Sequence, residues 1–107
     1  MACRGEYLLV TTTCPDRENA RKIAGLIVEA RLAACVQLLP IDSIYTWKGE
    51  VCDESEILLL IKSKSVLYDK LQTLIWRNHA YDVPEIIQVP LTGGLPAYMK
   101  WIDEVTD

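Results

Sequence analysis

The 107-residue chain lacks the features that define several large classes of protein. Its longest apolar run is only a handful of residues, far short of the ~20 that a transmembrane helix needs. The N-terminal stretch MACRGEYLLV has neither the apolar core nor the small-residue cleavage site of a signal peptide. Lys and Arg number 11 against 15 Asp and Glu, and a net charge of −4 works against binding to a phosphate backbone. These absences predict a cytosolic protein that binds neither membranes nor nucleic acids.

The chain also has few groups suited to catalysis or crosslinking. Its four cysteines, Cys3, Cys14, Cys35 and Cys52, show no CxxC spacing, and reduced thiols are expected in a cytosolic domain with its own core. The only histidine, His79, has no serine or acid at a recognisable motif spacing. Because no set of nucleophile, base and orienting residue is visible, the sequence gives no support for an enzyme.

The composition that remains is typical of a globular protein. Half of the residues are apolar and 24% are charged, which excludes a disordered chain. A chain of this length forms one domain that can bury a core without disulfides or metal staples. We therefore predict a single domain over residues 1–107, with residues 1–6 flexible.

The most informative stretch, residues 43–63, contains two strand-forming runs folded around residues 47–50. The second arm, residues 51–64, would be about 45 Å long at ~3.3 Å per residue. A compact chain of this length has a diameter of only ~35 Å. A hairpin longer than the body that carries it, with an apolar run at residues 57–61, needs a partner to cover it. The pattern predicts an oligomer.

Apolar periodicity predicts four strands and three helices in the order β-α-β-β-α-β plus a terminal helix. The strands are expected at residues 7–13, 34–47, 51–63 and 85–91, and the helices at residues 16–31, 65–77 and 96–105. This order is typical of the α+β, ferredoxin-like fold, a split β-α-β arrangement, with an overgrown hairpin.

Single residues mark several element boundaries. Asp16 and Ser65 are expected to cap the first and second helices, and Pro96 to open the third. Pro40 predicts a bulge or a sheet edge, because proline cannot donate to a strand ladder, and Pro90 is expected to break the last strand.

The fold hosts many functions, so the site must decide among them. An RNA-recognition domain would carry aromatic side chains on its third strand, and residues 56–61 contain none. A soft-metal chaperone would present CxxC in the first loop, where this chain has Cys14 alone. An acyl-phosphate hydrolase would need a glycine-rich phosphate cradle, which residues 11–15 do not provide.

Four linked motifs resemble the CutA divalent-cation tolerance family. They are RLAACV at residues 31–36, SIYTWKGE at residues 43–50, IKS at residues 61–63 and HAYDVPE at residues 79–85. The resemblance extends over about residues 10–105. It implies a ferredoxin-like homotrimer whose long hairpins lock the subunits together. It also implies binding of a divalent metal, chiefly copper, and a role in metal tolerance.

The resemblance points to His79 as a copper ligand, because a histidine before the tyrosine of this motif has that proposed role in the family. The alternative is an ordinary surface-loop histidine. The family's sites also use a cysteine near the end of the first strand and a second histidine, and this chain has Thr12 and Asn78 there. Cys14 can replace that cysteine if its loop curls inward. His79 and Cys14 are thus the candidate ligands for Cu(II) or another divalent metal.

By the same resemblance, Trp47, Lys62, Tyr81 and Glu85 are candidates for a pocket between subunits. The alternative is structural: Lys62 and Glu85 form an ion pair or bond to backbone at the trimer interface, and Trp47 packs against a neighbour.

Two further groups have mainly structural interpretations. The acidic residues Glu50, Asp53, Glu54 and Glu56 are expected to form a solvated face near the hairpin tip that could hold hard cations weakly. Cys35 is expected in the core.

The resulting hypothesis is a cytosolic homotrimer that binds a divalent metal without turnover. Two alternatives stay open. One is a signalling trimer of the nitrogen-regulatory PII type that binds a small ligand between subunits. The other is a purely structural trimer.

Overall fold

The computed structural model describes residues 6–107, so the predicted flexibility of residues 1–6 lies almost entirely outside the described part. Eight elements follow one another along the chain: β1 (Tyr7–Cys14), α1 (Arg17–Glu29), β2 (Cys35–Trp47), β3 (Glu50–Lys64), the short 3₁₀ turn η1 (Ser65–Leu67), α2 (Tyr68–Asn78), β4 (Ile86–Leu91) and α3 (Pro96–Val105). The four strands form one antiparallel sheet in the order β2-β3-β1-β4. The predicted α+β, ferredoxin-like arrangement is confirmed.

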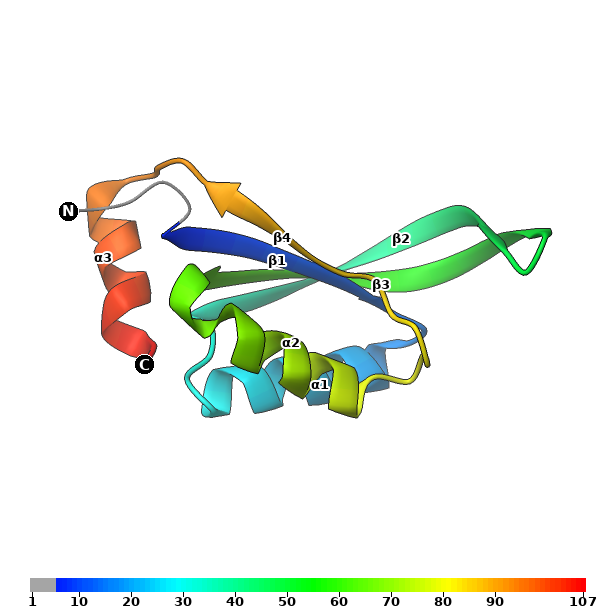
Figure 1. The fold of residues 1–107 in the computed structure, drawn as a ribbon, viewed down its shortest axis with the longest axis horizontal. Coiled ribbons are helices and arrows are strands. Elements are labelled where there is room, and N and C mark those ends of the chain that lie inside the picture. Colours follow the sequence, from blue (N-terminus) through cyan, green and yellow to red (C-terminus); the bar gives the residue numbers. More distant parts are fainter. Residues whose placement is uncertain (1–5) are drawn as a thin grey trace.

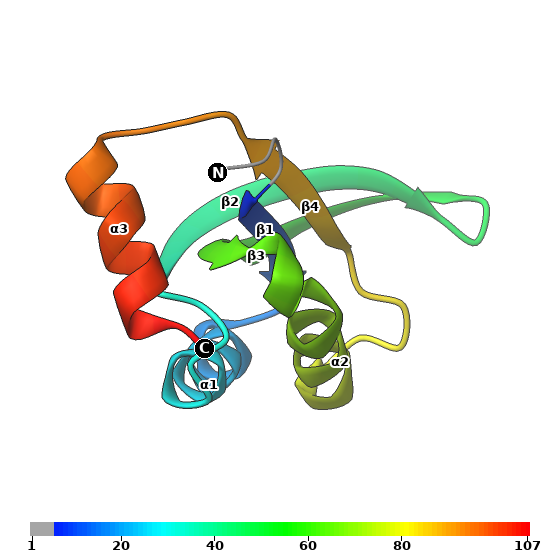
Figure 2. The same cartoon turned by 60° about the vertical axis from the view of Figure 1, so that its left-hand side comes forward.

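Helices α1 and α2 lie side by side against one face of the sheet (Figures 1 and 2). Strand β1 alternates as a half-buried strand should, with Leu8, Val10 and Thr12 turned to the helices. Helix α1 buries Ile23 and Ile27 against them, because residues four apart lie on one face of a helix. The core therefore lies between the sheet and these two helices.

The β2–β3 hairpin projects well beyond the helices, as Figure 1 shows, and gives the molecule a longest extent of 47 Å against 25 and 22 Å. At its tip Lys48 and Gly49 have φ of 50° and 80°. Two central residues with positive φ form the type I′ turn that matches the twist of the flanking strands. The long hairpin predicted from the sequence is thus present, and β3 runs over 15 residues.

Both strand prolines lie within unbroken strands. The register of β2 with β3 continues from Cys35 to Trp47, and Pro40 pairs with Ile57 without a bulge. Pro90 pairs with Leu8 inside β4, so the predicted break at Pro90 is wrong. Since β2 and β4 are the two edges of the sheet, the nitrogen of each proline, which carries no hydrogen, can face the open side, where no strand needs a donor. Of the two alternatives predicted for Pro40, the edge is the correct one.

The helix boundaries agree in part with the sequence. Asp16 is the N-cap of α1, and its Oδ1 accepts from the Asn19 N–H at 2.8 Å, as predicted. Ser65 does not cap α2, because its Oγ donates to the carbonyl of Glu6 and the residue begins η1. Helix α1 ends at Glu29, two residues earlier than expected, since Arg31 already adopts a left-handed φ of 60°.

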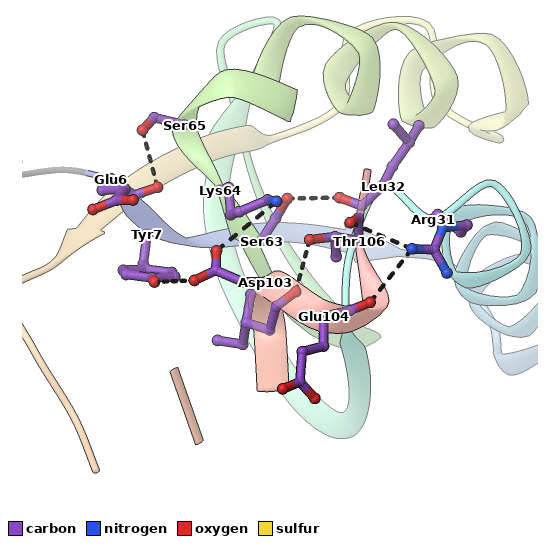
Figure 3. A network of polar contacts seen from close by, with 11 residues as sticks. Glu6, Tyr7, Arg31, Leu32, Ser63, Lys64, Ser65, Asp103, Glu104 and Thr106 are labelled. Atoms are coloured by element: carbon purple, nitrogen blue, oxygen red, sulfur yellow. Dashed lines mark hydrogen bonds and ion pairs between the residues drawn. The ribbon is translucent and has the colours of Figure 1, made fainter. Parts of the chain in front are cut away.

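Polar contacts attach α3 to the end of the sheet (Figure 3). Asp103 accepts from the Tyr7 hydroxyl at 2.5 Å and lies 3.9 Å from Lys64 Nζ. The Arg31 side chain donates to the carbonyls of Glu104 and Thr106. This network explains why α3 stands at that end of the sheet.

Only part of the apolar surface of α3 is buried. Pro96 opens the helix as predicted, and Ile102 is fully buried. Tyr98 and Trp101, one helical turn or less before Ile102, are still 40% and 38% exposed in the single chain. Within residues 6–107, no helix combines the length and hydropathy required to span a bilayer.

Candidate functional site

His79 and Cys14 lie next to each other, at the point where α2 ends and β1 ends. His79 is the C-cap residue of α2, and its ring turns toward the end of β1. There its Nε2 is 3.1 Å from Thr12 Oγ1 and 3.8 Å from Cys14 Sγ. Thr12 and Cys14 are two residues apart in β1, so both point to the same, fully buried face. No inward curl of the following loop is needed, because Cys14 is itself the last residue of the strand.

The backbone on both sides of His79 is held by one side chain of α1. Asn19 Nδ2 donates to the Asn78 carbonyl at 3.1 Å, and Asn19 Oδ1 accepts from the Ala80 N–H at 3.3 Å. Because Asn19 is fixed in turn by the Asp16 cap, the position of the histidine is tied to the start of α1. The Asn78 side chain points away and donates to Leu74 O within α2.

Hydrogen bonds determine which ring nitrogen of His79 carries the proton. The Tyr81 backbone N–H donates to His79 Nδ1 at 3.1 Å, so Nδ1 must present its lone pair. In the neutral ring the proton therefore resides on Nε2, which faces Thr12 Oγ1.

Tyr81 also contacts His79 through its ring and anchors the loop to the hairpin. The two rings stack with their centroids 5.3 Å apart and an interplanar angle of 30°. The Tyr81 hydroxyl donates to Glu56 Oε2 at 2.8 Å. Burial and this bond to Glu56 raise the pKa of Tyr81, so the phenol remains a donor at neutral pH.

Glu56 differs from its sequence-based interpretation. We expected it on a solvated acidic face, yet it is only 7% exposed, because it lies six residues back from the hairpin turn, where the loop of Tyr81 covers it. It also lines a cavity of about 280 Å³ together with Asp42, Ser55, Pro15 and Pro40. The other members of the acidic group, Glu50, Asp53 and Glu54, are exposed as expected.

Both candidate ligands are neutral at neutral pH. Burial, followed by the charges of Asp16 and Glu56, raises the pKa of the Cys14 thiol to about 11. Burial lowers the pKa of His79, against the opposing effects of the Thr13 backbone and the Glu56 charge. A metal ion bound here must therefore displace the thiol proton but has no imidazolium proton to displace.

The spacing of the two donor atoms fits a shared metal ion. With bonds of ~2.0 Å to nitrogen and ~2.3 Å to sulfur, one ion accommodates donor separations from ~3.5 Å to ~4.3 Å. The observed 3.8 Å between His79 Nε2 and Cys14 Sγ lies within this range. In the described part of the chain no group of three or more His, Cys, Asp or Glu side chains is arranged to hold a metal. The remaining coordination positions would fall to water or to another copy of the chain.

The four pocket candidates do not converge in one chain. Trp47 pairs with Glu50 at the hairpin tip, whereas Lys62 pairs with Cys35 at the other end of the hairpin, about 40 Å away at ~3.3 Å per residue. Any pocket containing both residues would therefore require two copies of the chain.

Within one chain, Lys62 and Glu85 bond to different partners, so the ion pair expected at the trimer interface stays a prediction. Lys62 Nζ donates to Gln37 Oε1 at 2.6 Å, while Glu85 accepts from Thr11 Oγ1 at 3.3 Å. Cys35, expected in the core, is half-buried on β2.

Sequence reasoning treated Thr12 only as a missing cysteine and did not consider Asn19 or Glu56 as part of the site. Strand alternation could have placed Thr12 beside Cys14, since the two are separated by one residue. No local pattern could have revealed Asn19 or Glu56, because their partners are 59 and 25 residues away in the chain.

The fold and the site together define a ferredoxin-like domain with a projecting hairpin and a half-buried histidine beside a buried cysteine at the end of its first strand. The family model of the CutA1 divalent ion tolerance protein matches residues 8–105. The chain belongs to this family.

Similar proteins extend from bacteria to plants and animals. A zebrafish (Danio rerio) CutA homolog is 47% identical over 105 residues, covering 96% of this chain and 70% of its own. A chloroplastic CutA of Arabidopsis thaliana is 44% identical, covering 92% of this chain and 55% of its own length. The divalent cation tolerance protein of Thermus thermophilus has a solved structure with a TM-score of 0.91 and 42% identity, covering 94% of this chain and 99% of that one. The chain therefore spans little more than half of the plant relative and nearly all of the bacterial one.

Proposed function

We propose that the chain forms a homotrimer that binds a divalent metal ion, with copper as the leading candidate, through His79 and Cys14. Its role in cation tolerance is then binding without turnover. The observation that carries this proposal is the 3.8 Å separation of His79 Nε2 and Cys14 Sγ at the end of β1. The proposal assigns the protein to the cytosol, although relatives named chloroplastic and periplasmic also occur.

The donor types favour copper and zinc over harder ions. Thiolate and imidazole are preferred by copper and zinc, whereas magnesium and calcium prefer oxygen ligands. Cys14 is buried and His79 is half-buried, and Asn19 bonds the backbone on both sides of His79, so the fold itself holds the two side chains close together.

Exposed apolar side chains on the hairpin support the trimer. Ile44 and Val51 are 73% and 78% exposed, and Trp47 lies beside them at the tip. The strands β2 and β4 are open edges, which invite pairing with another chain. Additional apolar side chains, Leu39, Ile87 and Val89, lie exposed on the face of the sheet opposite α1 and α2. Association with two further copies would cover these surfaces.

A calorimetric titration tests the metal site. Reduced protein under nitrogen is titrated with Cu(II), and separately with Zn(II), beside His79→Ala. We expect submicromolar binding in the unaltered protein and a loss of about 100-fold or more in the variant, because replacing even an outer partner of a metal ligand costs 10- to 100-fold.

The matched control is Cys52→Ser, which removes a half-buried thiol from the hairpin and leaves both proposed ligands in place. Its affinity should equal that of the unaltered protein. Millimolar binding in all three proteins would contradict the metal site and favour the structural trimer.

A further inference from the structure

His79 Nδ1 accepts a hydrogen bond, whereas the corresponding nitrogen of a metal-bound histidine needs an acceptor to which it can donate. A histidine that binds metal through one nitrogen normally donates the N–H of the other to a carbonyl, a carboxylate or water. Here Nδ1 faces another donor, the Tyr81 backbone N–H, at 3.1 Å. The hydrogen bond is favourable only while Nδ1 has no proton. The observed bonds therefore stabilise the tautomer whose Nε2 lone pair is unavailable.

We propose, on the basis of the proposed metal site, that metal binding at His79 breaks the hydrogen bond from the Tyr81 N–H. Tyr81 then moves away from the imidazole ring. A bond from Nε2 to the metal uses the lone pair on that nitrogen. The ring proton must therefore leave Nε2 and settle on Nδ1, and the thiol proton of Cys14 passes to solvent. Two N–H donors then face each other at the distance of a hydrogen bond, with no acceptor between them.

The contacts around the loop determine which part moves. Asn19 fixes the backbone at Asn78 and Ala80, on either side of His79, so the histidine itself remains in place. Tyr81 is held by its bond to His79 Nδ1, by ring stacking and by its hydroxyl on Glu56. Loss of the first contact strains the other two, and the displacement reaches the hairpin through Glu56.

Tyr81 and Glu56 thus act as positioning residues. In the metal-free state they hold His79 in the tautomer that does not bind metal, which lowers the affinity. When metal is bound, Tyr81 and Glu56 move apart. This movement passes to β3, the strand that continues into the projecting hairpin. The site is then a metal sensor as well as a metal store.

Nitrogen-15 NMR tests the coupling directly, because His79 is the only histidine in the chain and its ring signals need no separate assignment. Zn(II), which is diamagnetic, is added to labelled, tag-free protein. We expect the metal-free ring to carry its proton on Nε2. At saturation the proton should appear on Nδ1, with a large shift and faster hydrogen exchange of the Tyr81 amide. A Zn(II)-bound ring with an unprotonated Nδ1 and an unchanged Tyr81 amide would overturn the proposal.

A matched pair of tyrosine variants gives a second measurement. Tyr81→Phe keeps the ring and the backbone N–H but removes the bond to Glu56, so the segment moves more easily and Zn(II) should bind about two- to tenfold more tightly. Tyr45→Phe removes the corresponding hydroxyl bond to Glu54 elsewhere on the hairpin and should leave the affinity unchanged. Equal or weaker binding by Tyr81→Phe would contradict the coupling.

The two proposals fail in different ways. If Zn(II) binds equally well to His79→Ala, or does not bind at all, the metal site itself is wrong and the coupling falls with it. If binding requires His79 but the tautomer does not change, the metal site stands and only the coupling is wrong.

Discussion

Shortening the hairpin should convert the proposed homotrimer to single chains. Replacing residues 44–53 by Asn-Gly preserves the pair of Ser43 with Glu54 and closes the strands with a favoured type I′ turn. It removes Ile44, Trp47 and Val51, which are all exposed in the single chain. Light scattering should show the mass falling from three times 12.1 kDa toward that of one chain, because the surface that drives association has gone.

The control for this experiment is Lys48→Asn, which keeps the whole hairpin. Asparagine tolerates the positive φ of position 48 better than lysine, so the turn should be retained and the mass should not change. A shortened chain that remained a stable trimer would show that the hairpin is not what holds the subunits together.

Metal affinity should rise steeply with pH. In the proposed site the metal requires the Cys14 thiolate, and the pKa of this thiol is about 11, so one proton is displaced for each ion bound at neutral pH. The apparent association constant should then increase about tenfold per pH unit from neutral pH up to that pKa. Below the lowered pKa of His79 a second proton competes, and the slope should approach about hundredfold per unit.

Zn(II) titrations between pH 7 and pH 9 in a fixed, weakly coordinating buffer measure this slope. Cys14→Ser provides the matched comparison, because serine keeps the size of the side chain without a thiol proton to displace. Its residual binding should vary little over that range. A pH-independent affinity in the unaltered protein would exclude Cys14 as a ligand.

Regular periodicity allowed most of the fold to be predicted. The hairpin length followed from an unbroken strand-forming run, and the three helices followed from apolar periodicity. The cap at Asp16 is a local interaction between residues three apart, which sequence shows directly.

The failures have a shared physical cause. Pro90 is tolerated because β4 is a sheet edge, and edge position is a property of the whole sheet. Ser65 finds its partner at Glu6, 59 residues away, instead of in its own helix. Helix α3 leaves Tyr98 and Trp101 exposed, because the single chain offers them too little surface to pack on.

The candidate site, like the fold, could be predicted from the sequence only in part. Sequence could nominate His79 and Cys14 from their chemistry and the family motif. It could not show that Thr12 and Tyr81 occupy both ring nitrogens of His79, because these bonds depend on how α2 and its loop dock against β1. That arrangement, more than the identity of the ligands, is what predicts a metal-dependent movement.

Cobalt(II) absorption spectroscopy tests the central claim most directly, because it reports the identity of the ligands. Co(II) is added to the reduced protein and to His79→Ala and Cys14→Ser under nitrogen. The account predicts a thiolate-to-cobalt charge-transfer band in the unaltered protein, lost in Cys14→Ser and strongly weakened in His79→Ala. Saturable Co(II) binding with no thiolate band, equal in all three proteins, would contradict a metal site formed by His79 and Cys14.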